Sequence, residues 1–214
     1  ERSTTESVFT DNSYVLWDGP SAYNGADIVA IASGITDPSQ NAKTGDMVQI
    51  WIFSTAGKPN DIAKAGDDGG TCGACPFKPT SDDSEINCYL RLYQQTALWK
   101  RYNEGRMKRM TPEQLATHLE TQQLNVRLGA YGDPAMIPLD VWHTVLSGAR
   151  KHTSYTHQWD WVSTDYADVT MASVETLADK RRANDMGYRT YRATTDIDDQ
   201  QGKEYPDTRH LTYH

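Results

Sequence analysis

The three cysteines of this chain lie in one short segment, in the pattern C-x2-C-x12-C. Cys72 and Cys75 belong to the run Thr-Cys-Gly-Ala-Cys-Pro, where a tight turn brings two thiols close enough to hold one ion, and Cys88 supplies a third thiol. If all three thiols bind one ion, the fold must bring Cys88 close to Cys72 and Cys75. The spacing predicts a metal site or an iron–sulfur site. Two other interpretations stay open: a redox pair with an uninvolved third thiol, and three unrelated buried thiols.

The overall composition limits the class of protein. The 214 residues carry a net charge of −8, so the protein as a whole should repel nucleic acid unless a local patch overrides the average. An odd number of cysteines without a secretory leader pattern predicts a reducing cytoplasm, with no disulfide scaffold. The longest apolar runs, such as 28–32, are too short to cross a bilayer, and we expect no membrane association.

The pattern along the chain predicts a flexible segment at 1–13, a single α/β domain at 14–193 and a polar tail at 194–214. In the first half we expect strands and turns, a Gly- and Asp-rich loop that carries the first two cysteines, and a helix. The expected elements are strand 15–17, turn 18–20, strand 28–32, buried strand 48–53, loop 66–75 and helix 89–104.

The second half alternates strands with helices. Thr111-Pro112-Glu113-Gln114 is a good helix start, with a cap, Pro at the first position and an acid in the first turn. The expected elements are helix 112–123, strand 125–131, helix 138–149, strands 154–159 and 169–174, helix 175–186 and strand 188–193. This order predicts an α/β fold with a mainly parallel sheet, open or rolled into a partial (β/α) barrel, and with an N-terminal β-hairpin.

Two segments could supply reactive groups beside the cysteines. Ligands of parallel α/β folds bind beyond the carboxyl ends of strands, and Gly132-Asp133-Pro134 follows an expected strand. Asp133 is therefore a candidate for catalysis and Gly132 a candidate for close backbone contact with a cofactor, although Gly-Asp-Pro is also ordinary turn chemistry. His157, in an expected strand, is a candidate metal ligand, general base or hydrogen-bonded core histidine.

A basic segment runs against the acidic trend of the chain. Its cations are Lys100, Arg101, Arg106, Lys108 and Arg109. They could hold the phosphates of a nucleotide or nucleic acid, with Tyr102 available to stack on a base. The alternative is a solvated basic face that balances an acidic protein. The sequence contains no P-loop, dinucleotide-binding, zinc-protease or nucleophile-elbow motif.

The run Thr71-Cys72-Gly73-x-Cys75-Pro76, the later Cys88-Tyr89, the pair Gly132-Asp133 and the strand Tyr155-Thr156-His157 resemble a group of uncharacterised, cysteine-rich bacteriophage-encoded proteins. The resemblance covers roughly residues 40–213. It implies the cytoplasm of an infected host cell, or the virion, as location. Members of that group carry further cysteines near the C-terminus, where this sequence has Tyr205 and Tyr213.

The layout is also similar, more distantly, to that of radical S-adenosylmethionine enzymes, which have partial barrels and three cysteines in an early loop. That likeness implies an iron–sulfur cluster with one open iron for S-adenosylmethionine. The usual C-x3-C-x2-C spacing is absent here.

Three functional hypotheses follow, and the residues leave open whether the protein is an enzyme. The first is a metal or iron–sulfur protein with redox or radical chemistry on a nucleotide or nucleic acid. The second is a binding module for a phage or host protein, held by structural zinc with His157, His210 or His214 as fourth ligand. The third is a virion or assembly component with unliganded thiols.

Overall fold

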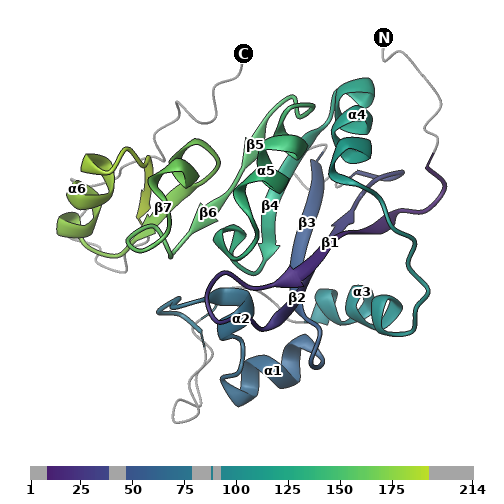
Figure 1. The fold of residues 1–214 in the computed structure, drawn as a ribbon, viewed down its shortest axis with the longest axis horizontal. Helices are drawn as coiled ribbons and strands as arrows, with labels where there is room; N and C mark the ends of the chain where they lie inside the picture. Colours follow the sequence, from purple (N-terminus) through teal and green to yellow (C-terminus); the bar gives the residue numbers. More distant parts are fainter. Residues whose placement is uncertain (1–8, 39–46, 79–87, 89–92, 193–214) are drawn as a thin grey trace.

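The computed structural model describes residues 9–38, 47–78, 88 and 93–192 (Figure 1). Its strands are β1 (Ser13–Pro20), β2 (Asp27–Ser33), β3 (Met47–Ser54), β4 (Asn125–Tyr131), β5 (His152–Thr153), β6 (Tyr155–Thr156), β7 (Met171–Val174) and β8 (Thr190–Arg192). Its helices are α1 (Pro59–Ala65), α2 (Gly69–Cys72), α3 (Tyr93–Asn103), α4 (Pro112–Gln122), α5 (Leu139–Leu146) and α6 (Leu177–Asp185), with short 3-10 helices η1 (Pro134–Met136) and η2 (Thr164–Asp168). The expected tail at 194–214 and most of the expected flexible segment at 1–13 lie outside the described residues.

The strands form two sheets. The first has the order β1-β2-β3-β4-β5, antiparallel from β1 to β3 and parallel from β3 to β5. The second, β6-β7-β8, is parallel throughout. Ser154 alone separates β5 from β6, so one extended segment passes from the first sheet into the second (Figure 1).

The α/β class and the N-terminal hairpin are confirmed, and the parallel arrangement holds in the C-terminal half. The expectation of one mainly parallel sheet is too simple, because the first sheet is mixed and the parallel strands are shared between two sheets. The described strands do not close into a barrel.

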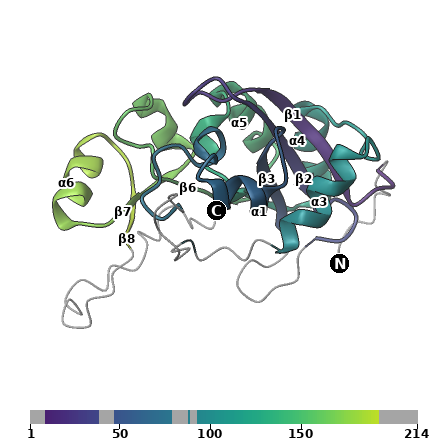
Figure 2. The ribbon, with the colours of Figure 1, turned by 90° about the horizontal axis from the view of Figure 1, so that it is seen from below.

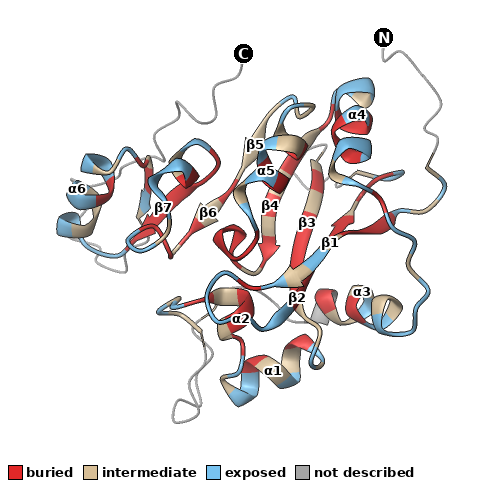
Figure 3. Ribbon diagram, viewed as in Figure 1, coloured by how far each residue is buried: buried red, intermediate tan, exposed pale blue. Residues whose placement is uncertain are grey.

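Helices cover both faces of the first sheet (Figures 1 and 2). Leu119 of α4 and Trp142 of α5 are fully buried in one cluster together with Ile28 and Ala30 of β2. Trp99 of α3 belongs to a second cluster, with the intervening β2 residues Val29 and Ile31. This alternation is expected of a strand buried on both faces, and Figure 3 shows the buried stripe along the central strands.

Helix α4 begins as its sequence predicts. The Thr111 hydroxyl accepts a hydrogen bond from the Gln114 N–H (3.2 Å), and the Gln114 side chain accepts one from the Thr111 N–H (2.9 Å). This reciprocal capping box satisfies two of the N–H groups that a helix start leaves without partners.

Two local predictions in the first half are wrong. Asp18, Gly19 and Pro20 do not form a turn, because they continue β1 and pair with β2 after a bulge between Val15 and Trp17. The expected loop 66–75 contains the short helix α2. In both places contacts with distant residues override a local turn signal; the N–H of Asp133, for example, donates to the Thr71 carbonyl (2.8 Å).

The other differences concern helix and strand lengths. Helix α1 was not predicted from the sequence; it has Pro59 in its first turn and is capped after Ala65 by Gly66 in the left-handed conformation. The expected strand 154–159 is reduced to β6, and the strand expected at 169–174 begins at Met171. Helix α3 begins at Tyr93, and residues 89–92 of the helix expected there lie outside the described part of the chain.

Candidate functional site

The segment with Cys72 and Cys75 lies at the carboxyl ends of parallel strands. It follows α1, which leads directly from β3, and α2 contacts β2, β3 and η1. The hydrogen bond from the Asp133 N–H to the Thr71 carbonyl ties α2 to the end of β4. This is the edge at which parallel α/β sheets bind ligands.

The three thiols lie in one neighbourhood and form no disulfide. Burial raises the pKa of the Cys72 thiol well above its ordinary value, and the charges of Asp68, Cys75, Asp133 and Cys88 raise it further. Burial likewise raises the pKa of Cys75 to about 11, with contributions from Asp133, Cys88 and Asp68. Because such charge effects weaken with distance, the three thiols and the two carboxylates belong to one site.

The donor chemistry of this site fits a metal, although the ligands are not closed around a point. Among the described residues, no three Cys, His, Asp or Glu side chains are gathered tightly enough to hold an ion as they stand. Thiolates are soft ligands that select zinc and iron–sulfur centres, and carboxylate oxygens also bind zinc. Since the raised pKa values keep the thiols of Cys72 and Cys75 protonated at neutral pH, a metal would have to displace their protons on binding.

Asp133 is buried and joins three parts of the site. Its Oδ1 accepts a hydrogen bond from the Ala135 N–H (3.0 Å), and its Oδ2 accepts one from the His157 N–H (2.9 Å) and one from Gln158 Nε2 (3.3 Å). The Thr156 side chain also bonds to this carboxylate. Burial raises the Asp133 pKa, and these four hydrogen bonds lower it. The carboxylate thus has a complete set of protein partners, which a structural role explains; a catalytic role for Asp133 stays a prediction.

Gln158 connects the end of β6 to the cysteine turn. Its Nε2 donates to the Cys72 carbonyl (3.0 Å), and its Oε1 accepts from the Ala74 N–H (3.0 Å) and from the Trp161 ring N–H (2.8 Å). The amide is fully buried and meets Gly73 so closely that a Cβ there would lie 2.4 Å from Oε1. Gln158 therefore fixes the backbone between the two cysteines.

His157 lies beside the cysteine segment without reaching the thiols. Its ring packs edge-on against Phe77, with centroids 5.5 Å apart, and its Nε2 is 3.4 Å from Glu175 Oε1 after β7. The geometry of that pair is not that of a hydrogen bond, so the buried Nε2 has no hydrogen-bond partner. Burial lowers the His157 pKa to about 4, so the ring is neutral at physiological pH.

The close approach at Gly132 is made by the protein itself. The residue has a φ of 79°, and a Cβ there would lie 2.7 Å from Ile52 Cβ and 2.9 Å from Thr71 Cγ2. Glycine is required because β3 and α2 pack against this turn. Contact between Gly132 and a cofactor stays a prediction.

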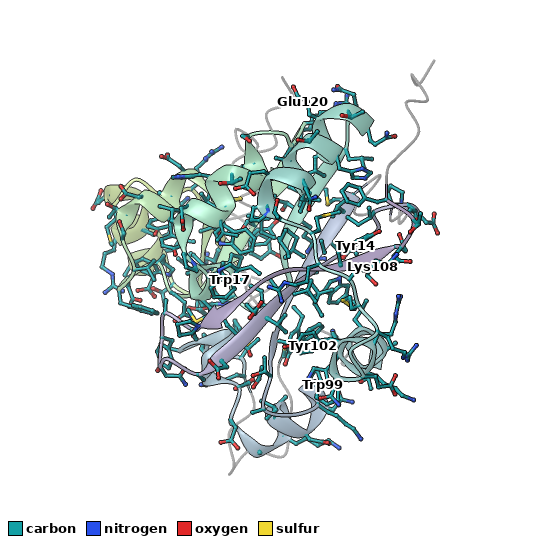
Figure 4. The ribbon with its side chains drawn as sticks, turned by 45° about the vertical axis from the view of Figure 1, so that its right-hand side comes forward. Tyr14, Trp17, Trp99, Tyr102, Lys108 and Glu120 are labelled. Atoms are coloured by element: carbon teal, nitrogen blue, oxygen red, sulfur yellow. The ribbon has the colours of Figure 1, made fainter. Side chains whose placement is uncertain are left out.

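The five cations of the basic segment all have partners at the surface. The pairs are Lys100 with Glu104 (3.9 Å), Arg101 with the Ser13 hydroxyl (3.2 Å), Arg106 with Glu104, Lys108 with Asp11 (3.1 Å) and Arg109 with Asp18. Tyr102 is partly buried and packs against the hydrophobic cluster that contains Trp99; Figure 4 labels both side chains. This arrangement is what a solvated basic face would have.

Two residues of the site, Asp68 and Gln158, were not predicted from the sequence. Asp68 stands in the Gly- and Asp-rich segment four residues before Cys72, and that helical spacing was the available signal. Gln158 is two residues after Thr156, so both side chains were expected on the same face of a strand. No local sequence pattern indicated that this face lies against Asp133 and Cys72.

The fold and the site thus define a mixed α/β protein with a thiol-rich site at the ends of its parallel strands. No protein-family model, no curated protein and no solved structure matches the chain. Within the described ranges, the helices are all too short or too polar to cross a membrane.

Proposed function

We propose that the protein binds a metal ion or an iron–sulfur centre through Cys72, Cys75 and Cys88. The observation that carries the proposal is the neighbourhood of the three thiols. Cys72 is the last residue of α2 and Cys75 lies in the turn after it. The charges of Cys75 and Cys88 raise the pKa of the Cys72 thiol, and the charge of Cys88 raises that of the Cys75 thiol. Three thiols outside any disulfide, with two buried carboxylates nearby, form a donor set for zinc or iron.

The other two candidate groups of the site, Asp133 and His157, are poorly suited to acid–base catalysis. We therefore assign the function to the metal centre itself. Asp133 already accepts hydrogen bonds on both oxygens, and His157 with a pKa of about 4 is a weak base at neutral pH. If the centre is iron–sulfur, it supplies electron transfer or, with an open iron, a binding point for S-adenosylmethionine. If it is zinc, it holds the cysteine segment in place for a binding partner.

The proposal does not extend to phosphate binding by the basic segment. Its five cations are matched by acidic or hydroxyl partners.

The test is anaerobic purification followed by elemental analysis and a visible absorption spectrum, on the wild type and on Cys75→Ser. Ala74→Ser is the matched control, because it alters the exposed residue of the same turn and leaves all thiols. Iron with broad visible absorption identifies an iron–sulfur centre, and one colourless zinc identifies a zinc site. Either metal should be lost in Cys75→Ser and kept in Ala74→Ser. A wild type without metal after reconstitution, or unchanged metal in Cys75→Ser, would overturn the proposal.

A further inference from the structure

Cys72 and Cys75 occupy the two ends of a β-turn. The Cys75 N–H donates a hydrogen bond to the Cys72 carbonyl (3.2 Å), which is the bond that closes a four-residue turn. Gly73, with φ 57° and ψ −134°, has the conformation of the first central residue of a type II′ turn, where glycine is preferred. The end residues of a β-turn have Cα atoms less than about 7 Å apart, and a disulfide spans Cα separations of roughly 4.4 to 6.8 Å. The backbone therefore holds the two cysteines at a separation that a disulfide can bridge.

Contacts from outside the turn keep it in this shape while the thiols are reduced. Gln158 donates to the Cys72 carbonyl and accepts from the Ala74 N–H, each at 3.0 Å. The Gly73 N–H donates to the Gly69 carbonyl (2.8 Å) and so joins the turn to α2. Because the backbone is already ordered, closing a disulfide between the turn ends costs little further conformational entropy.

Cys75 is the thiol that a small molecule in solution reaches first. The residue is partly exposed and stands between Ala74 and Pro76, which are both exposed. Burial raises the pKa of its thiol to about 11, and a hydrogen bond from the Phe77 N–H to its sulfur lowers it. Cys72, at the inner end of the turn and the last residue of α2, is placed to react with Cys75 in a second step.

We propose that Cys72 and Cys75 are a redox modification site, at which a small disulfide such as glutathione disulfide converts the pair to an intramolecular disulfide. Cys75 loses its proton to water, attacks one sulfur of glutathione disulfide, forms a mixed disulfide and releases one glutathione thiolate. Cys72 then loses its proton, attacks the Cys75 sulfur and displaces the second glutathione. The pair gives up two protons and two electrons, and glutathione disulfide takes up both to become two molecules of glutathione. Cys88 stays a thiol.

This inference goes beyond the proposed function and does not depend on it, because the disulfide needs no metal. If the metal centre forms, the disulfide removes two of its three thiols, so oxidation prevents metal binding. In a reducing compartment, disulfides of this kind are transient and sense the redox state.

Equilibration of the metal-free protein with glutathione tests the proposal. Protein treated with a chelator is incubated anaerobically in glutathione buffers of increasing oxidised fraction, with and without denaturing urea. Equilibrium is approached from the reduced and from the oxidised side, because a thiol pKa of about 11 makes exchange slow. Acid quenching, maleimide labelling in denaturant and peptide mass spectrometry then count the thiols and locate the disulfide.

In the folded wild type we expect the thiols of Cys72 and Cys75 to disappear together while Cys88 remains labelled. The equilibrium constant for oxidation should exceed that of the urea-unfolded chain by about tenfold or more, which corresponds to about 30 mV in reduction potential, because only the folded protein holds the turn. Cys88→Ser should oxidise as the wild type does. Cys75→Ser should accumulate only mixed disulfides with glutathione.

Three results would overturn the proposal: a disulfide that includes Cys88, mixed disulfides that never close in the wild type, or equal equilibrium constants in the folded and unfolded chains. A wild type that forms the Cys72–Cys75 disulfide but binds no metal when reduced would support this inference and overturn the metal centre alone.

Discussion

The side-chain amide of Gln158 lies directly against Gly73 and bonds the backbone on both sides of it. Its Nε2 donates to the carbonyl of Cys72 and its Oε1 accepts from the N–H of Ala74, each at 3.0 Å. The first of these bonds spans 86 positions of sequence. The shape of the cysteine turn therefore depends on the end of β6 as much as on the turn itself.

A side chain at Gly73 should disrupt this contact. Gly73 has a φ of 57°, and a Cβ would overlap the Gln158 amide. Gly105→Ala is the control, because Gly105 has a φ of 64° in open space and costs about 1 kcal/mol of backbone strain. We expect Gly73→Ala to lower the free energy of unfolding by about 2 kcal/mol more than Gly105→Ala, measured by urea denaturation of the metal-free protein. Equal losses in the two variants would contradict the contact.

Asp133→Asn should destabilise the fold. The substitution places an N–H₂ group where Asp133 Oδ2 now accepts hydrogen bonds from the His157 N–H and from Gln158. Donors would then face donors in a buried site, and we expect a loss of about 2 kcal/mol or more in the free energy of unfolding. Asp185→Asn, at an exposed position in α6, should change it by less than about 0.5 kcal/mol. An Asp133→Asn variant as stable as the wild type would show that these bonds are not structural.

His157 should make stability depend on pH. Burial lowers its folded-state pKa to about 4 from 6.5, so the unfolded chain binds more protons between these values. Its contribution is complete above pH 6.5 and decreases as the pH falls towards 4. For the metal-free protein, His157 should account for about 2 kcal/mol of the loss in unfolding free energy between about pH 7 and pH 5.

The comparison of His157→Asn with His143→Asn, an exposed residue of α5, tests this expectation. Urea denaturation at the two pH values should show a smaller pH dependence in His157→Asn and the wild-type dependence in His143→Asn. A wild-type pH dependence in both variants would mean that His157 is not buried in neutral form.

The Cys75 thiol should alkylate slowly in the folded, metal-free protein. With a pKa of about 11, its thiolate fraction near pH 8 is about 200-fold below that of an ordinary thiol. The greater nucleophilicity of a more basic thiolate recovers about tenfold, so the net reduction is about 20-fold. Iodoacetamide labelling followed by peptide mass spectrometry measures this rate, with the urea-unfolded chain as reference. Equal rates in the folded and unfolded protein would show that the thiol is not buried.

Local chemistry made part of the fold predictable. Helix α4 is encoded by Thr111, Pro112 and Gln114, whose capping contacts lie within four residues of one another. The buried strands around Ile28–Ala32 and Val48–Phe53 follow from continuous apolar runs, and the break at Gly132 follows from its turn residues. The closeness of Cys72 and Cys75 is a property of their spacing.

Long-range contacts decided the rest. Asp18, Gly19 and Pro20 have the composition of a turn, yet they extend β1 because β2 supplies their partners. Helix α2 is formed by residues of low helix propensity, held by the bond from Asp133 to Thr71 and by the close packing of Gly70 on Ala26.

The sequence by itself determined the α/β class, the capped start of α4 and the closeness of Cys72 and Cys75, because each depends on residues that are near one another in the chain. Only the tertiary structure decided that Asp68 is buried, that Gln158 fixes the turn and that Asp133 is fully bonded. Burial removes these polar groups from water, so their partners must come from whichever strand end the fold brings near, and no local pattern encodes that choice.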